Sequence, residues 1–128
     1  MMECIMIVDD DFDDLQNMKD ILEEAGYQVI PTTNGAQALD MIRQNEIDLI
    51  LLDIKMPTLS GYDLLLLLKE RKGHDTPIIY VTIIPENDVD MAGAIGVIQK
   101  PISKNSLLSQ VRKGIDNRTE AEKCQRQS

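Results

Sequence analysis

The sequence predicts a single α/β domain: a doubly wound parallel sheet with helices on both faces. Short apolar runs alternate with segments of helical periodicity from residue 4 to about residue 116, which is typical of such folds. Residues 49–52 are four consecutive large aliphatic side chains, the pattern of a central strand that is buried on both faces. The length of 128 residues suits one ordinary domain and is too short for two.

The strands are recognised as short apolar runs that end at a carboxylate or a turn residue. The first run ends at Asp9, the second is closed by Pro31, and the third ends at Asp53. The five expected strands cover residues 4–8, 27–30, 48–53, 77–82 and 95–98.

Helices are expected after the first, second, third and fifth of these strands. The first ends at Gly26, the second follows the turn-like Asn34-Gly35, and the third follows the Ser60-Gly61 turn. The last begins after Ser103, which suits an N-cap, and carries one apolar face. The expected helices cover about residues 15–25, 36–42, 62–72 and 103–116. We expect the domain to end near residue 116, with 117–128 as a polar tail or a frayed extension of the last helix, and no output domain.

Composition narrows the function classes. The net charge of −9 and the pI near 4.5 argue against nucleic-acid binding, which needs a basic stripe. The two cysteines, Cys4 and Cys124, have no CxxC or histidine companions, so neither zinc nor a disulfide framework is expected. No apolar run is long enough for a membrane span, and the first residues lack the basic region of a signal peptide. We expect a cytoplasmic protein without membrane contact.

Polar residues that suit phosphoryl chemistry follow four of the expected strands. The strand ends near Asp10, Asp53, Thr82 and Lys100 open onto one edge of a parallel sheet. Three converging carboxylates, from Asp9, Asp10 and Asp53, would repel one another without a cation, and an all-oxygen ligand set suits Mg²⁺. A divalent metal and a lysine beside an aspartate are what an incoming phosphoryl group needs.

These motifs resemble, in order, those of the response-regulator receiver domains of two-component signalling. The matching residues are Ile7-Val8-Asp9-Asp10-Asp11, Leu51-Leu52-Asp53-Ile54-Lys55-Met56-Pro57, Ser60-Gly61-Tyr62, Val81-Thr82 and Gln99-Lys100-Pro101. The resemblance covers residues 4 to about 116 and implies a flavodoxin-like, CheY-like sheet with strand order 2-1-3-4-5. Any one of these motifs alone is weak, whereas the set in this order is specific.

The resemblance also implies roles for the residues at that edge. Asp53 would be the phosphoacceptor. Its phosphoryl group would come from a sensor histidine kinase or a phosphotransfer protein. Asp10, Asp53 and the backbone carbonyl of Lys55 would hold Mg²⁺, with Asp9 acting mainly through water. Lys100 would pair with the phosphoryl group or with Asp53, and Thr82 would turn toward the phosphate on activation. The Lys100-Pro101 bond is expected to be cis.

Three features depart from the family pattern. Val97 stands where an aromatic residue usually swings inward with the threonine, and a valine cannot act as that switch. The bulky Ile83 and Ile84 follow Thr82, and we expect them to narrow access to the phosphoryl group and to slow dephosphorylation. Only 18 positions separate Thr82 from Lys100, which is short for the family and includes Pro85, Gly93 and Gly96. The fourth helix is therefore expected to be one turn or missing.

The other acidic and apolar clusters receive ordinary interpretations. Asp11, Asp13 and Asp14 suit the start of a helix, where the dipole favours negative charge. The run 64–68 is all leucine; at helical spacing Leu64, Leu65 and Leu68 face the core, whereas Leu66 and, less surely, Leu67 face solvent. An exposed leucine is common, so a docking patch for a partner on this helix stays a hypothesis.

We predict a stand-alone receiver that is a phosphorylation switch and signals through contacts with a downstream protein. A degenerate receiver that binds partners constitutively is the alternative: the complete acid, threonine and lysine set opposes it, and Val97 and Ile83 favour it. A haloacid-dehalogenase-type enzyme needs a second acid two residues after the nucleophile, where this chain has Lys55. A flavodoxin-like cofactor binder is disfavoured because three aspartates after the first strand repel a phosphate.

Overall fold

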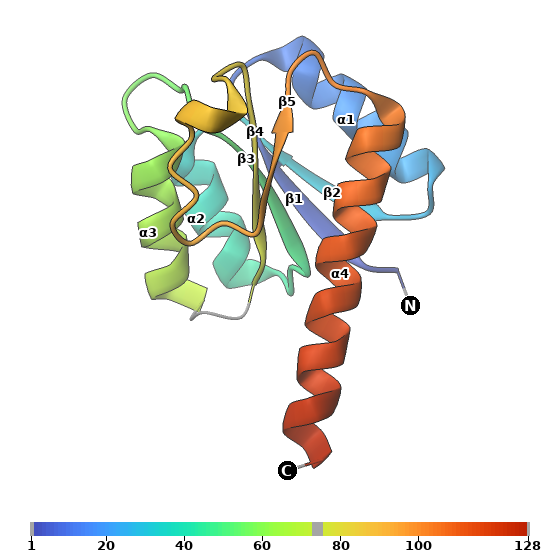
Figure 1. Ribbon diagram of the computed structural model, residues 1–128. Coiled ribbons are helices and arrows are strands. Elements are labelled where there is room, and N and C mark those ends of the chain that lie inside the picture. The colour runs from blue at the N-terminus through green and yellow to red at the C-terminus, as the bar shows by residue number, and fades with distance from the viewer. Residues whose placement is uncertain (1, 73–75, 128) are drawn as a thin grey trace.

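The computed structural model of the chain describes residues 2–72 and 76–127, and for residue 72 and residues 117–127 it describes the backbone alone. The strands are β1 (Cys4–Val8), β2 (Gln28–Thr32), β3 (Leu49–Asp53), β4 (Ile78–Thr82) and β5 (Gly96–Gln99). The helices are α1 (Phe12–Glu24), α2 (Gly35–Gln44), α3 (Gly61–Lys72), the 3₁₀ turn η1 (Glu86–Asp88) and α4 (Lys104–Gln127). All strand pairs are parallel, in the order β2-β1-β3-β4-β5, which confirms the predicted fold class (Figure 1).

Helices cover both faces of the sheet, with α2 and α3 on one face and α1 and α4 on the other (Figure 1). Successive residues of β3 supply the two cores in turn: Ile50 and Leu52 pack with α2 and α3, and Leu49 and Leu51 pack with α1 and α4. Every residue of β3 is buried. The aliphatic run therefore forms the central strand, as the sequence predicts, because each face of the sheet is covered.

Side-chain caps fix the starts of three helices. Asp11 accepts hydrogen bonds from the backbone N–H groups of Asp13 and Asp14, at 3.0 and 3.1 Å. Asn34 accepts one from Gln37 N–H at 2.9 Å, and the Ser103 hydroxyl accepts one from Ser106 N–H at 3.4 Å. These caps satisfy donors that the first turn of a helix leaves without partners.

The predicted end of the second strand is wrong. Pro31 does not close β2 but lies inside it, paired in register with Ile7. Gln28 N–H donates to Glu3 and the Thr32 carbonyl accepts from Asp9 N–H, so alternate residues of β2 face β1 and the nitrogen of Pro31 faces the free edge of the sheet. An edge strand tolerates proline there because the missing N–H has no ladder partner.

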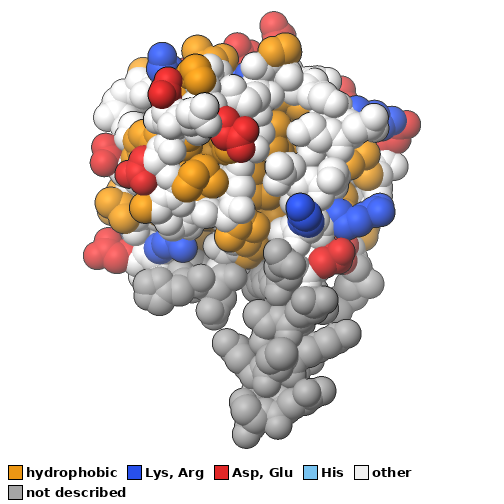
Figure 2. Space-filling model, viewed as in Figure 1, with side chains coloured by type: hydrophobic (Ala, Val, Ile, Leu, Met, Phe, Trp, Pro, Cys, Tyr) orange, Lys and Arg blue, Asp and Glu red, His pale blue; other side chains and the backbone are white. Residues whose placement is uncertain are grey.

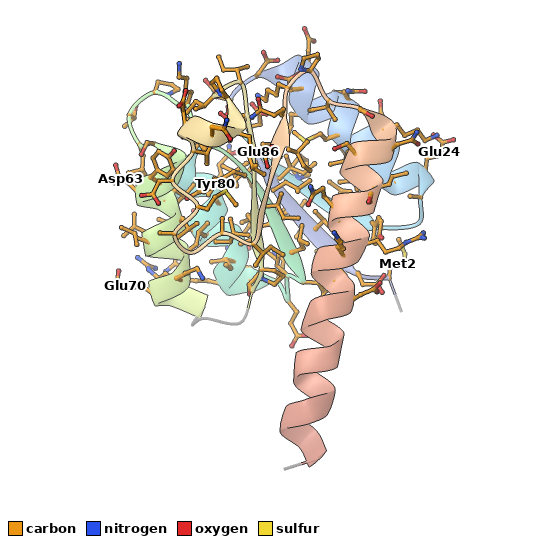
Figure 3. All side chains as sticks on the ribbon, viewed as in Figure 1. Met2, Glu24, Asp63, Glu70, Tyr80 and Glu86 are labelled. Carbon is orange, nitrogen blue, oxygen red and sulfur yellow. The ribbon has the colours of Figure 1, made fainter. Side chains whose placement is uncertain are left out.

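The segment between β4 and β5 contains one 3₁₀ turn in place of a full helix, as its short length predicts. It lies against α3: a Cβ built on Gly93, whose φ is +87°, would approach Leu65 Cδ2 to 2.7 Å, and the Tyr62 hydroxyl accepts a hydrogen bond from Asp90 N–H at 3.0 Å. Figure 3 shows Glu86 on this turn and Tyr80 on the side of β4 that faces α3. The rings of Tyr62 and Tyr80 form an edge-to-face contact with centroids 5.5 Å apart.

The leucine run of α3 divides as its helical spacing predicts. Leu64, Leu65 and Leu68 are buried, whereas the side chain of Leu66 is 65% exposed and Leu67 is half-buried. On the side of the molecule that carries η1, hydrophobic side chains are interspersed with acidic and basic ones (Figure 2).

The last helix, α4, continues from Lys104 to Gln127. Its backbone therefore follows the helical alternative for residues 117–127, while residue 128 lies outside the described part of the chain. Among the described residues, none of the helices combines the length and the apolar character that crossing a bilayer requires.

Candidate functional site

The predicted site residues follow the ends of neighbouring strands at one edge of the sheet. β1 ends at Val8 directly before Asp9, and Asp53, the last residue of β3, pairs in register with Val81, directly before Thr82. On the other side, Lys100 N–H donates to the Thr82 carbonyl at 2.9 Å and continues the β4-β5 ladder. Because parallel strands end at the same edge, residues distant in sequence meet there.

Three carboxylates converge at this edge. Carboxylate oxygens of Asp9, Asp10 and Asp53, one from each residue, lie within 4.8 Å of one another. Asp9 and Asp53 are buried, whereas Asp10 is exposed and open to solvent. The structure therefore brings together the three predicted acidic residues and leaves them accessible from one side.

Lys100 enters the cluster from the loop after β5 and is almost buried, with 9% of its side chain exposed. Its Nζ atom lies 3.0 Å from Asp9 Oδ2, 3.0 Å from Asp14 Oδ2 and 3.5 Å from Asp53 Oδ2. The predicted proximity of Lys100 to Asp53 is present, but its two shorter contacts are with other carboxylates.

Asp14 is the residue that sequence reasoning missed, because the helix-dipole interpretation alone was given to Asp11, Asp13 and Asp14. Asp11 and Asp13 do lie at the start of α1 as that interpretation expects, whereas the side chain of Asp14 forms an ion pair with Lys100. The sequence gives no signal for this contact, because Asp10 lies before the N-cap of α1 and the helical spacing rule does not relate it to Asp14.

Burial and mutual repulsion perturb the titration of the cluster. Burial, and then the negative charge of Asp9, raise the pKa of Asp53 to about 7, against the opposing effect of Lys100. Burial also raises the pKa of Asp9. Burial alone would lower the pKa of Lys100, but the close contacts with the Asp14 and Asp9 carboxylates outweigh it and raise the pKa, so the lysine is charged at neutral pH.

The donor set is compatible with a hard divalent cation. The groups are carboxylate oxygens, as Mg²⁺ prefers, and the buried Oδ2 of Asp9 has an ion pair with Lys100 but accepts no hydrogen bond. Burial and neighbouring negative charges raise the pKa values of Asp9 and Asp53, and a bound cation would favour their charged forms. Lys55 is exposed, in the loop directly after β3.

The cluster opens into a pocket of about 370 Å³. Its lining residues are Asp10, Asp11, Asp14, Asp53, Lys55, Ile83 and Lys100. The Ile83 side chain stands at this pocket with 62% of its surface exposed, which places an apolar group beside the carboxylates.

Thr82 is buried, and its Oγ1 accepts a hydrogen bond from Ile84 N–H at 3.1 Å. Val97, which pairs in register with Tyr80, is buried among the side chains of the α2 and α3 face. The Lys100-Pro101 peptide bond is cis, as expected.

Comparison with known proteins identifies the family. Residues 5–112 match the family model described as response regulator receiver domain. The polar-differentiation response regulator DivK of Brucella anthropi is 36% identical over 108 residues, which cover 80% of this chain and 88% of that protein. DivK of Brucella ovis is 35% identical over the same shares.

Solved structures agree with the sequence comparison. A CheY-like receiver domain protein from Methanospirillum hungatei superposes with a TM-score of 0.86 at 32% identity, covering 94% of this chain and 99% of that one. The response regulator TrrA from Thermotoga maritima, solved in complex with Mg²⁺-BeF, gives a TM-score of 0.80 at 30% identity, covering 88% of this chain and 99% of that one. The family match over most of the chain, together with the strand order, shows that this protein belongs to the response-regulator receiver family, a family of phosphorylation-switch signalling domains.

Proposed function

We propose that this protein is a receiver of the cytoplasm, with residues 1–116 as its receiver domain and 117–128 as a polar extension. Asp53 accepts a phosphoryl group from a phosphohistidine of a sensor histidine kinase or a phosphotransfer protein. The phosphorylated chain then signals by contact with a downstream protein. The observation that carries this proposal is the convergence of Asp53 with Asp9, Asp10 and Lys100 at one open edge of the sheet.

Phosphotransfer to Asp53 is a displacement at phosphorus. A carboxylate oxygen of Asp53 forms a bond to phosphorus as the bond between phosphorus and the donor imidazole nitrogen breaks, and the imidazole leaves with that electron pair. The Lys100 ammonium, 3.5 Å from Asp53 Oδ2, is placed to balance the negative charge on the transferred group. Thr82, at the end of the neighbouring strand, supplies a hydroxyl donor when its side chain turns toward the phosphate.

Mg²⁺ is the proposed cofactor, held by Asp10, Asp53 and the backbone carbonyl of Lys55, with Asp9 acting mainly through water. When bound, the cation supplies positive charge that offsets the carboxylates and the phosphoryl oxygens. Three converging carboxylates with one lysine leave a net negative site, which supports this assignment. The Mg²⁺-BeF complex of TrrA gives independent support from a similar chain.

Loss of the phosphoryl group requires attack by water on phosphorus, which releases inorganic phosphate and restores the Asp53 carboxylate. The side chain of Ile83 lines the pocket through which that water must enter. We therefore propose that autodephosphorylation is slow and is the only further reaction that the domain catalyses on itself.

The second candidate is a degenerate receiver that binds partners without phosphorylation. Val97 favours it, because this small buried side chain cannot act as an aromatic rotamer switch. The reduction of the fourth helix to one turn also favours it, since the face that helix forms in the family is altered here.

Labelling with a small phosphodonor separates the two candidates. Purified protein is incubated with acetyl phosphate with and without Mg²⁺, and the phosphorylated fraction is measured by intact mass. We expect Mg²⁺-dependent addition of one phosphoryl group, absent in Asp53→Asn and retained in Asp20→Asn, a control on the exposed face of α1. Folded wild-type protein that stays unlabelled would support the degenerate receiver.

A further inference from the structure

The Lys100 ammonium is bracketed by three carboxylates, and one of them lies outside the proposed phosphoacceptor and metal set. Asp14 Oδ2 is 3.0 Å from Nζ, as close as Asp9 and closer than Asp53 at 3.5 Å. An ammonium group has three donors and no acceptor. Asp14 supplies one of the three carboxylates within 3.5 Å of this ammonium, from the α1 side.

The position of Asp14 is fixed by the start of its helix. Asp11 caps α1 and binds the backbone N–H groups of both Asp13 and Asp14. The Asp14 side chain is 31% exposed, whereas Lys100 is 9% exposed, so their contact lies at the border between the pocket and solvent. Asp14 is thus a fixed anchor for a side chain that arrives from the opposite end of the sequence.

Without that anchor, the ammonium has two nearby carboxylates left, those of the buried Asp9 and Asp53. It would then pair more closely with both and compete with a cation for their oxygens. Loss of the Asp14 charge also reduces the negative potential that attracts a divalent ion. Both effects lower the affinity of the site for the cation.

We propose that Asp14 is a positioning residue: it holds Lys100 on the α1 side of the pocket and so keeps the Asp9, Asp10 and Asp53 oxygens open to a divalent cation. The role of the cation rests on the function proposed above, whereas the Asp14-Lys100 contact does not. Asp14 acts through Lys100, and its effect on cation binding therefore depends on the lysine.

Mg²⁺ affinity, measured by titration calorimetry at neutral pH, tests this role. Asp14→Asn keeps the size of the side chain and removes its charge, and we expect a several-fold loss of affinity. Asp13→Asn is the matched control, because it removes the same charge from the same first turn of α1 at an exposed residue. We expect its change in the logarithm of the Mg²⁺ affinity to be less than half that of Asp14→Asn. Asp14→Glu, which keeps the charge, should restore most of the affinity.

Dependence on the lysine is tested by repeating Asp14→Asn in a Lys100→Met background, where we expect the further loss of affinity to shrink to that caused by Asp13→Asn, the part due to charge alone. A loss as large as in the wild-type background, or equal losses from Asp13→Asn and Asp14→Asn when Lys100 is present, would overturn the positioning role.

A second readout needs neither metal nor phosphorylation. In EDTA, the urea midpoints of wild type, Asp14→Asn, Lys100→Met and the double variant form a double-mutant cycle. We expect the double variant to lose clearly less than the sum of the two single losses. Additive shifts would contradict the Asp14-Lys100 coupling without bearing on the phosphorylation of Asp53. Conversely, failure of Asp53 to be labelled would contradict the proposed function without bearing on this coupling.

Discussion

The backbone of Gly61 lies against the carbonyl of Asp53. A Cβ built on Gly61 would be 2.3 Å from the Asp53 carbonyl oxygen and 2.7 Å from Ile54 Cα, and Gly61 N–H donates to the Ile54 carbonyl at 2.8 Å. The start of α3 is therefore packed directly on the end of β3, where no side chain fits.

Gly61→Ala should destabilise the protein by about 1–3 kcal/mol, because the methyl group can be accommodated only by moving backbone away from Asp53. It should also lower the rate of acetyl phosphate labelling. Urea unfolding and the labelling assay measure the two effects. Gly96→Ala is the control, since its Cβ would meet only the side chain of Gln110 at 3.0 Å; equal losses of stability in the two variants would contradict this account.

The pKa of Asp53 predicts a pH dependence of stability in metal-free protein. Asp53 titrates near 7 in the folded chain, because burial and Asp9 disfavour its charge, and near its ordinary value of 3.8 when unfolded. Between these two pH values the folded state holds a proton that the unfolded state has released. The free energy of unfolding therefore falls as pH rises from about 4 toward 7. Asp53→Asn, which stays uncharged, should not suffer that loss.

The stability of Asp53→Asn relative to wild type should therefore increase by roughly 2 kcal/mol between about pH 5 and pH 8. Urea unfolding in EDTA at the two pH values measures it, with Asp20→Asn as a control that should show no such trend. A stability difference that does not change with pH would show that Asp53 titrates near its ordinary value.

Adjacent leucines of α3 should differ sharply in their contribution to stability. Leu65 is 2% exposed and Leu66 is 65% exposed. Leu65→Ala should cost about 2–5 kcal/mol through lost burial and a residual cavity, and Leu66→Ala less than about 0.5 kcal/mol. Thermal and urea unfolding of the two variants compare them directly; similar losses would mean that α3 is rotated from its described orientation.

The sequence was sufficient for most of the fold because β1, β3 and β4 are buried along their whole length and so appear as apolar runs. The exception, Pro31, shows the limit of local rules: a proline ends a strand only where its nitrogen faces a partner strand, and the order of strands decides that. The split between Leu65 and Leu66 was predictable because it follows from helical geometry alone.

Site residues were predictable where they follow strands, since all the parallel strands end at one edge. The Asp14-Lys100 contact was not, because it depends on how far α1 is rotated about its axis and on the path of the loop after β5. The raised pKa of Asp53 likewise depends first on the burial of Asp53 itself and then on the charge of Asp9 beside it, and sequence spacing specifies neither.

Ile83 should control how long the phosphoryl group remains on Asp53. Its side chain lines the pocket that contains Asp53 and Lys100, so Ile83→Ala should widen the path for the attacking water and speed dephosphorylation several-fold. Phosphorylated protein is freed of donor, and loss of the label in Mg²⁺ is followed by intact mass. Ile95→Ala is the matched control: Ile95 is also exposed, at 53%, but lies at the opposite end of β5 beside α4. Equal rates for the two variants, or a wild-type label lost within seconds, would show that Ile83 does not shield the phosphoryl group.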